Sequence, residues 1–164
     1  MDEQRVEVVA QALRDAGVEF ERPGPEVFVA ALPGDRRLKT ACWLRVGEHA
    51  LTVEAFVMRH PDENREQVYA YLLRHNARTY AVSWSIDDQG DVYLTGHVPL
   101  AAITPDELDR ILGAVLEYAD SAFNALLQLG FGSSIKREWR WRVKRGESLA
   151  NLAAFADFAQ RDDR

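Results

Sequence analysis

The sequence has little of what secreted and membrane proteins require. It contains one cysteine, Cys42, so no disulfide can form within the chain. No apolar run approaches the roughly 18 residues that a membrane-spanning helix needs. The first residues, MDEQRVEVVAQAL, are acidic and amphipathic, whereas a signal peptide is basic and then apolar. The sequence therefore predicts a cytoplasmic protein without a membrane span.

The sequence also lacks an excess of basic residues. Its formal net charge is −6 at pH 7 and its pI is about 5.2, which argues against nucleic acid as a general partner. The 164 residues are 47% hydrophobic and 28% charged, within the ordinary globular range. This length suits one domain, or one domain with a helical appendage.

Catalytic and metal-binding motifs are missing from the sequence. The turn from Asp87 to Asp91 has the spacing of a calcium loop, but Val92 and Val98 occupy the glycine and glutamate positions of that motif. Cys42 lies in an apolar segment, where a thiol is usually inert. No zinc-ligand spacing connects the histidines, which are His49, His60, His75 and His97. We expect no enzyme activity, no cofactor and no metal.

Apolar periodicity and turn residues divide the chain into regular elements. The short breaks between strands favour antiparallel hairpins. The sequence thus predicts an α+β fold with an antiparallel sheet flanked by helices and a helical C-terminal extension. The predicted order is a helix, three strands, a helix, two strands and a long helix, at residues 4–16, 27–32, 40–46, 50–58, 64–75, 80–86, 92–98 and 104–130.

The long helix has clear terminal signals. Thr104 can accept a hydrogen bond from the backbone at Glu107, whose side chain can reach back, and Pro105 suits the first turn. Gly130 and Gly132 can end the helix. We expect Ser148 to cap one further helix.

The C-terminal part of the chain differs in charge from the rest. Residues 136–145, KREWRWRVKR, hold six basic residues and one acid, a local charge of +5 that leaves −11 elsewhere. We therefore predict an α+β domain over residues 1–131. A basic, tryptophan-containing helical extension over residues 132–164 is expected to pack on it.

The element order, the WSID…GDVYLTG hairpin and the TPDELDRILGAVLEYAD helix resemble one bacterial family. They are similar to the YbjN-like group of the type III secretion chaperone-like fold, over roughly residues 4–131. The tract SIKREWRWRVKRGESLANL looks like an actinobacterial-type extension. The resemblance implies a small acidic protein that binds extended protein segments as a homodimer, in a chaperone-like or regulatory role. It carries no catalytic motif.

Alternation along the strands predicts a binding face. We expect Val27, Val29 and Ala31 to point inward with the alternate residues of the next two strands. The opposite face would then be too apolar for a solvated surface. Partner binding is predicted there, with burial against helices or a second copy as the alternative, for Phe28, Trp43, Phe56 and Met58.

The long helix predicts a second contact surface. One apolar stripe suffices to cover the sheet, and another lies beside it, so the helix has more apolar width than one contact needs. The second stripe would dock on the C-terminal helices or form a homodimer face. It consists of Leu112, Leu116, Phe123 and Leu127.

The basic tract allows two interpretations. Its arginines and tryptophans could grip phosphates and stack on bases, or lie on an anionic surface. Alternatively, Ile135, Trp139 and Val143 form a stripe that docks the helix on the domain, where the arginines pair with acidic groups. The candidate patch is Arg137, Trp139, Arg140, Trp141 and Arg142.

Together these features predict a non-enzymatic protein-binding module that is chaperone-like or regulatory. It would act as a homodimer and bind a segment of an unidentified protein partner. The alternative function is a nucleic-acid or anionic-surface binder that works through residues 136–145.

Overall fold

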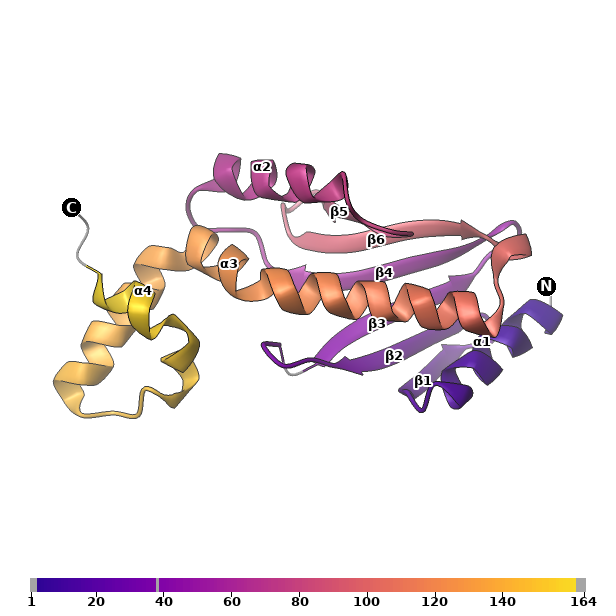
Figure 1. The fold of residues 1–164 in the computed structure, drawn as a ribbon, viewed down its shortest axis with the longest axis horizontal. Coiled ribbons are helices and arrows are strands. Elements are labelled where there is room, and N and C mark those ends of the chain that lie inside the picture. Colours follow the sequence, from indigo (N-terminus) through magenta and orange to yellow (C-terminus); the bar gives the residue numbers. More distant parts are fainter. Residues whose placement is uncertain (1–2, 38, 162–164) are drawn as a thin grey trace.

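The computed structural model describes residues 3–37 and 39–161 (Figure 1). Within these residues the strands form one antiparallel sheet in the order β1-β2-β3-β4-β6-β5. The predicted α+β class and antiparallel sheet are confirmed. The strands are β1 (Glu19–Gly24), β2 (Val27–Pro33), β3 (Lys39–Val46), β4 (Ala50–Met58), β5 (Ser83–Ile86) and β6 (Val92–Pro99).

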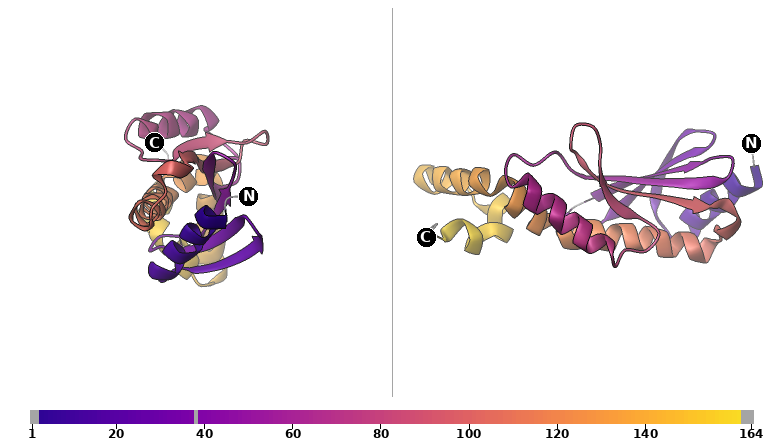
Figure 2. Two further views of the ribbon diagram at one scale, coloured as in Figure 1. Left: turned by 90° about the vertical axis from the view of Figure 1, so that its right-hand side faces the viewer. Right: turned by 90° about the horizontal axis from the view of Figure 1, so that it is seen from above.

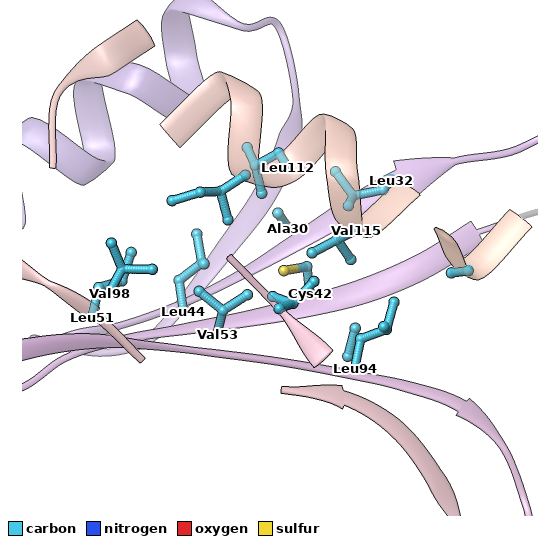
Figure 3. Packing of buried hydrophobic residues seen from close by; sticks show 14 of the residues in the cluster. Ala30, Leu32, Cys42, Leu44, Leu51, Val53, Leu94, Val98, Leu112 and Val115 are labelled. Carbon is cyan, nitrogen blue, oxygen red and sulfur yellow. The ribbon is translucent and has the colours of Figure 1, made fainter. Parts of the chain in front are cut away.

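The helices lie on one side of this sheet. Figure 2 shows α3 running beneath the strands, with α1 and α2 on the same side. The core forms between the two layers, and Figure 3 shows Cys42, Leu44 and Val53 of the sheet facing Leu112 and Val115 of α3. The helical elements are α1 (Glu3–Asp15), α2 (Arg65–Asn76), α3 (Pro105–Arg145) and α4 (Ala156–Gln160), with 3-10 turns η1 (Leu100–Ala102) and η2 (Ala150–Phe155).

Strand β1 is an addition to the predicted order, because four strands rather than three precede α2. Its sequence, EFERPG, is polar and contains proline, so it lacks the alternation that marks a strand. The strand forms at the edge of the sheet by pairing with β2, where proline is tolerated. The Phe20 ring packs on Phe28 with 5.9 Å between centroids. Pairing with β2 and one aromatic contact thus stabilise β1, although its residues have little strand propensity of their own.

The predicted inward face of β2 is wrong. Phe28, Ala30 and Leu32 are buried, whereas Val27 and Val29 lie on the opposite face. Both alternating sets of β2 are apolar, so alternation alone cannot choose between them. The pairing with β3 decides, because Phe28 lies opposite Leu44 in the register.

Met58 also lies on the other side from its predicted place. A register shift between Phe56 and Met58 interrupts the pairing of β4 with β6. Such a bulge breaks the alternation, so Val57 and Met58 are both buried.

The start of α3 follows its predicted cap. The backbone N–H of Glu107 donates to Thr104 Oγ1 at 3.1 Å, and Pro105 lies in the first turn. The Glu107 carboxylate does not reach back to the cap. It accepts instead from Tyr80 Oη and pairs with Arg110, which ties the segment before β5 to the helix.

The predicted end of this helix coincides with a break, because a kink between Gly130 and Gly132 divides α3 into two helical segments. The second segment follows without a loop and ends at Arg145, where Gly146 adopts the left-handed conformation with φ 68°. The chain bends at Phe131, whose φ of −135° is not helical.

The loop before α2 stabilises the bend. The carbonyl of Gly130 accepts the N–H groups of Asp62 and Glu63 at 2.9 and 3.1 Å. The carboxylate of Glu63 accepts from the backbone N–H and the hydroxyl of Ser133. A Cβ atom on Gly130 would lie 2.8 Å from Pro61 Cβ, so glycine permits this close approach. The glycine therefore permits a tertiary contact at the point where the first helical segment ends.

Candidate partner-binding surface

No helix of the described residues covers one face of the sheet. Its residues alternate with the buried ones, and its exposed large hydrophobic side chains include Trp43, 44% exposed, and Phe56, 40% exposed. Phe56 makes an edge-to-face contact with Tyr93, with 5.5 Å between ring centroids. We call this apolar surface the open face, and it comprises Val29, Ala31, Ala41, Trp43, Phe56 and Tyr93.

The structure divides the four residues that were predicted to bind a partner. Trp43 and Phe56 lie on the open face, whereas Phe28 is fully buried and Met58 is 3% exposed. The phase of β2 and the bulge in β4 move the latter two into the core. Their predicted place on a binding face is therefore wrong. A binding role for Trp43 and Phe56 stays a prediction.

A groove begins where the open face ends. It has a volume of about 810 Å³ and lies between the end of β4, the β2–β3 loop and the second half of α3. Phe56 belongs to both the open face and the groove. The apolar floor is Phe56, Val57, Met58, Phe123, Leu127 and Phe131, and the basic rim is Arg36, Arg37, Lys39 and Arg59.

Asp120 of α3 holds the β2–β3 loop over this groove. Its Oδ1 atom accepts the backbone N–H groups of Arg36 and Arg37 at 2.7 and 2.9 Å. These bonds, that of Arg37 above all, hold the pKa of the Asp120 carboxyl below its usual range. A Cβ atom on Gly34 would lie 2.5 Å from Asp120 Oδ1, so glycine is needed at the turn.

Arg37 occupies the inner edge of the groove. Its guanidinium lies over the rings of Phe56 and Phe123, at 5.9 and 5.1 Å from their centroids. It also donates to the backbone carbonyl of Val57. Burial lowers the pKa of Arg37, since the guanidinium loses part of its hydration.

The predicted second stripe of α3 is also divided. Leu112 is 4% exposed and belongs to the core, so it cannot form a docking face. Leu116 is partly buried at the edge of the core. Phe123 and Leu127 are partly buried and line the groove. Sheet and groove thus account for much of the apolar width of the helix, and a dimer face on the remainder stays a prediction.

The basic tract lies on the part of α3 that projects beyond the sheet (Figure 1). Trp139 is buried and lines a small cavity with residues of α4. Trp141 is 46% exposed, with the Arg145 guanidinium 4.6 Å from its ring. Arg137 donates to Ser134 Oγ, and Arg140 is exposed.

The arginines of the tract were expected to pair with the acidic body. The structure instead places the ion-pair partners of Arg142 and Arg145 within the extension, at Glu138 and Glu147. Each partner lies within four residues of its arginine, so no docking is needed for these pairs. The division between 131 and 132 stays a prediction, and so does the packing of the extension on the body.

The described residues hold no group of three or more His, Cys, Asp or Glu side chains placed to bind a metal ion. Asp87 Oδ1 accepts the backbone N–H groups of Gln89 and Asp91, which closes the β5–β6 turn. Burial raises the pKa of the Cys42 thiol to about 12, so it stays protonated at neutral pH. No described helix combines the length and hydropathy needed to cross a bilayer.

The rim of the groove was missed by the sequence reasoning. The sequence does contain a signal for a basic loop, since the turn Pro33-Gly34-Asp35 leads directly into Arg36 and Arg37. It contains no signal that Asp120 anchors this loop, because an acid on a helix usually faces water. Only the fold shows that this acid holds the loop.

Comparison with protein families places the chain. A family model for YbjN, with the description "Putative bacterial sensory transduction regulator", matches residues 5–128. The chain belongs to the YbjN family. An uncharacterized protein of Mycobacterium tuberculosis is 52% identical over 169 residues, which cover 96% of this chain and 92% of that protein. This similarity extends past the family match, so the relative shares most of the extension.

Solved structures confirm the type III secretion chaperone-like fold. A chain of the ExsC–ExsE complex has a TM-score of 0.57 and 19% identity, covering 77% of the YbjN-family chain and 96% of its own length. A chain of the HopA1–SchA chaperone–effector complex has a TM-score of 0.51 and 15% identity, covering 73% and 94% respectively. At these identities the likeness concerns the fold.

Proposed function

We propose that this YbjN protein is a non-enzymatic, chaperone-like or regulatory module that binds an extended segment of another protein. The observation that carries the proposal is the open face, where Trp43 and Phe56 expose aromatic surface beside the small residues Ala31 and Ala41. The fold adds support, since one structural neighbour is a chaperone–effector complex. The fold alone is a weak argument for function, so the surface must carry the proposal.

The open face suits an extended segment for a physical reason. Side chains alternate along a strand, so every second residue of a bound segment can contact an apolar sheet surface. Aromatic side chains of Trp and Tyr type dominate the energy of many interfaces. Complete burial of the exposed part of Trp43 would contribute on the order of 1 kcal/mol or more.

We further propose a homodimer in the cytoplasm. Two-fold dimers are the commonest oligomers, and the partly buried Leu116 gives α3 apolar surface for such a contact on the helix side of the sheet, away from the open face. The single cysteine is buried and free, which suits the reducing cytoplasm. Sedimentation velocity over a range of protein concentrations measures the oligomeric state.

Affinity capture from cells tests the binding role. We expect Trp43→Ala and Phe56→Ala to reduce the recovery of proteins that co-purify with wild type, with far-ultraviolet circular dichroism as the check on folding. Trp141→Ala is the matched control, because Trp141 is equally exposed and lies on the extension. Unchanged recovery with folded Trp43→Ala and Phe56→Ala proteins would refute the role of the open face.

The same control addresses the alternative function through the basic tract. That tract offers a nucleic acid fewer groups than its sequence suggests. Trp139 is buried, and Arg142 is engaged by Glu138 and the carbonyl of Ser148. Filter binding at low and moderate salt measures whether the protein retains nucleic acid. If Trp141→Ala alone lost its co-purifying proteins or its salt-sensitive retention of nucleic acid, the alternative function through the basic tract would be favoured.

A further inference from the structure

The groove at the end of the open face differs in charge from the protein as a whole. The chain carries −6, yet the charged residues that line the groove are all cations: Arg36, Arg37, Lys39 and Arg59. No carboxylate is among the lining residues that the structure describes. A local reversal of charge beside an apolar floor indicates a ligand that is both anionic and apolar.

The cations are held in place by the fold. Asp120 binds the backbone of Arg36 and Arg37 rather than their side chains, so the anchoring leaves both guanidinium groups at the groove. At the opposite edge, the Arg59 guanidinium lies 4.2 Å from the Phe131 ring centroid and pairs with Asp62. The guanidinium groups of Arg37 and Arg59 are therefore held before any ligand arrives, which lowers the entropic cost of binding.

Arg37 is a charge whose hydrogen-bond acceptors are neutral. Its guanidinium is half-buried and donates to the backbone carbonyls of Val57 and Lys39. A partly desolvated cation is stabilised by an anion more strongly than a fully hydrated one. A carboxylate on a ligand would supply that anion.

The floor of the groove suits side chains rather than phosphates or lipid headgroups. Phe123 and Leu127 are partly buried, and Phe56 is 40% exposed. A nucleic acid would place phosphates against the cations but leave this apolar floor in contact with polar groups. The headgroups of a bilayer would likewise place polar groups against this floor. The groove also continues the open face through Phe56, so one extended chain can contact both.

We propose that the groove binds an acidic protein segment whose apolar side chains fill the floor while its carboxylates meet Arg36, Arg37 and Arg59. The inference rests on the proposed function and adds the chemistry of the partner. It also gives the two surfaces separate roles, since the open face supplies apolar area and the groove selects for negative charge.

Fluorescence anisotropy with designed peptides tests the inference. The probe is a labelled peptide that alternates glutamate with leucine and phenylalanine, and two matched peptides carry glutamine or lysine in place of glutamate. The proteins are full-length wild type, Arg36→Glu/Arg59→Glu, and Arg74→Glu. Arg74→Glu is the matched control, because Arg74 is exposed on α2, away from both the groove and the open face. Circular dichroism confirms that each variant is folded.

We expect the glutamate peptide to bind wild type and the Arg74→Glu protein alike. Arg36→Glu/Arg59→Glu should weaken it by roughly tenfold at low salt, and added salt should narrow the difference. Equal binding of the glutamate and glutamine peptides, or no effect of the rim variant, would overturn the inference.

Two further measurements exclude other occupants. Stronger rim-dependent binding of anionic lipid vesicles or of single-stranded DNA than of the glutamate peptide would overturn the commitment to a protein segment. Loss of a wild-type dimer in the Arg36→Glu/Arg59→Glu protein would assign the groove to a second copy. If cellular partners depend on Trp43 but not on the rim, this inference fails while the proposed function stands.

Discussion

The two faces of the sheet differ both in their side chains and in their surroundings. Along β3 the residues alternate between a fully buried set and an exposed set that includes Trp43. The buried set packs against α3, as Figure 3 shows for Cys42 and Leu44. The exposed set consists of Lys39, Ala41, Trp43 and Arg45, on the face that the described helices leave uncovered. The more apolar set of β3 therefore became the core, and Trp43 stays exposed because no described helix covers its face.

The reactivity of thiols on the two faces should show the largest difference. We expect Cys42 to react with a disulfide reagent only when the protein unfolds, because it is buried with a pKa raised to about 12. In a Cys42→Ala/Ala41→Cys protein the thiol faces solvent and should react on the order of a thousandfold faster or more. Stopped-flow absorbance measures both rates.

Denaturant supplies the control for this comparison. In concentrated guanidinium chloride both thiols should react at the same rate, since neither face exists. Rapid reaction of Cys42 under native conditions would contradict the assignment of the core.

The second largest effect is expected in the free energy of unfolding, when substitutions at two neighbouring residues of β3 are compared. Leu44→Ala should lower the free energy of unfolding by about 2–5 kcal/mol, because it leaves a cavity in the core. Trp43→Ala should lower it by less than about 1 kcal/mol, since the indole is 44% exposed. Guanidinium titration followed by circular dichroism gives both values. If Trp43→Ala lowered the free energy of unfolding as much as Leu44→Ala does, at low and at high protein concentration alike, the open face would be covered by the same chain rather than by a second copy.

The smallest effect concerns the boundary between the two faces, where Asp120 holds the β2–β3 loop. Asp120→Asn should cost about 1 kcal/mol at neutral pH, because an amide oxygen accepts more weakly than a carboxylate. The native pKa of Asp120 lies below its ordinary value of 3.8, so its contribution is complete above that value. It is lost as the pH falls through the lower native pKa.

Acid titration checks the sign of this effect. The difference between wild type and Asp120→Asn should be constant near neutral pH and shrink below about pH 4. Asp109→Asn, an exposed change on the same helix, is the matched control and should show no such trend. A difference that grows in acid would contradict the hydrogen bonds from Arg36 and Arg37.

Particular residues show why part of the fold was predictable. Thr104 and Glu107 lie three residues apart at a helix start, so the cap depends on local chemistry and appears as expected. Gly130 and Gly132 flank the kink of α3, as their local signal indicates, whereas the contacts from Pro61 and Glu63 that hold the bend come from a distant loop. β1 was missed because its strand forms by pairing rather than by propensity.

The candidate site, like the fold, was predictable only in part. Trp43 and Phe56 reach the open face because β3 and the first part of β4 alternate regularly. Phe28 and Met58 do not reach the open face. Both alternating sets of β2 are apolar and a bulge interrupts β4, so the sequence does not show which way these two side chains point. The groove unites Arg36, Arg59 and Phe123, which come from three separate elements, so no short-range pattern could reveal it.

The sequence by itself determined the α+β class, the antiparallel hairpins, the acidic balance and the cap of α3, because periodicity, turn residues and capping act over a few residues. The tertiary structure decided the phase of β2, the contacts that hold the bend of α3 at Phe131 and the cationic groove on an acidic protein. Each of these depends on pairing or packing between segments far apart in the chain, where the register and the close approach of backbones select among local conformations of similar energy.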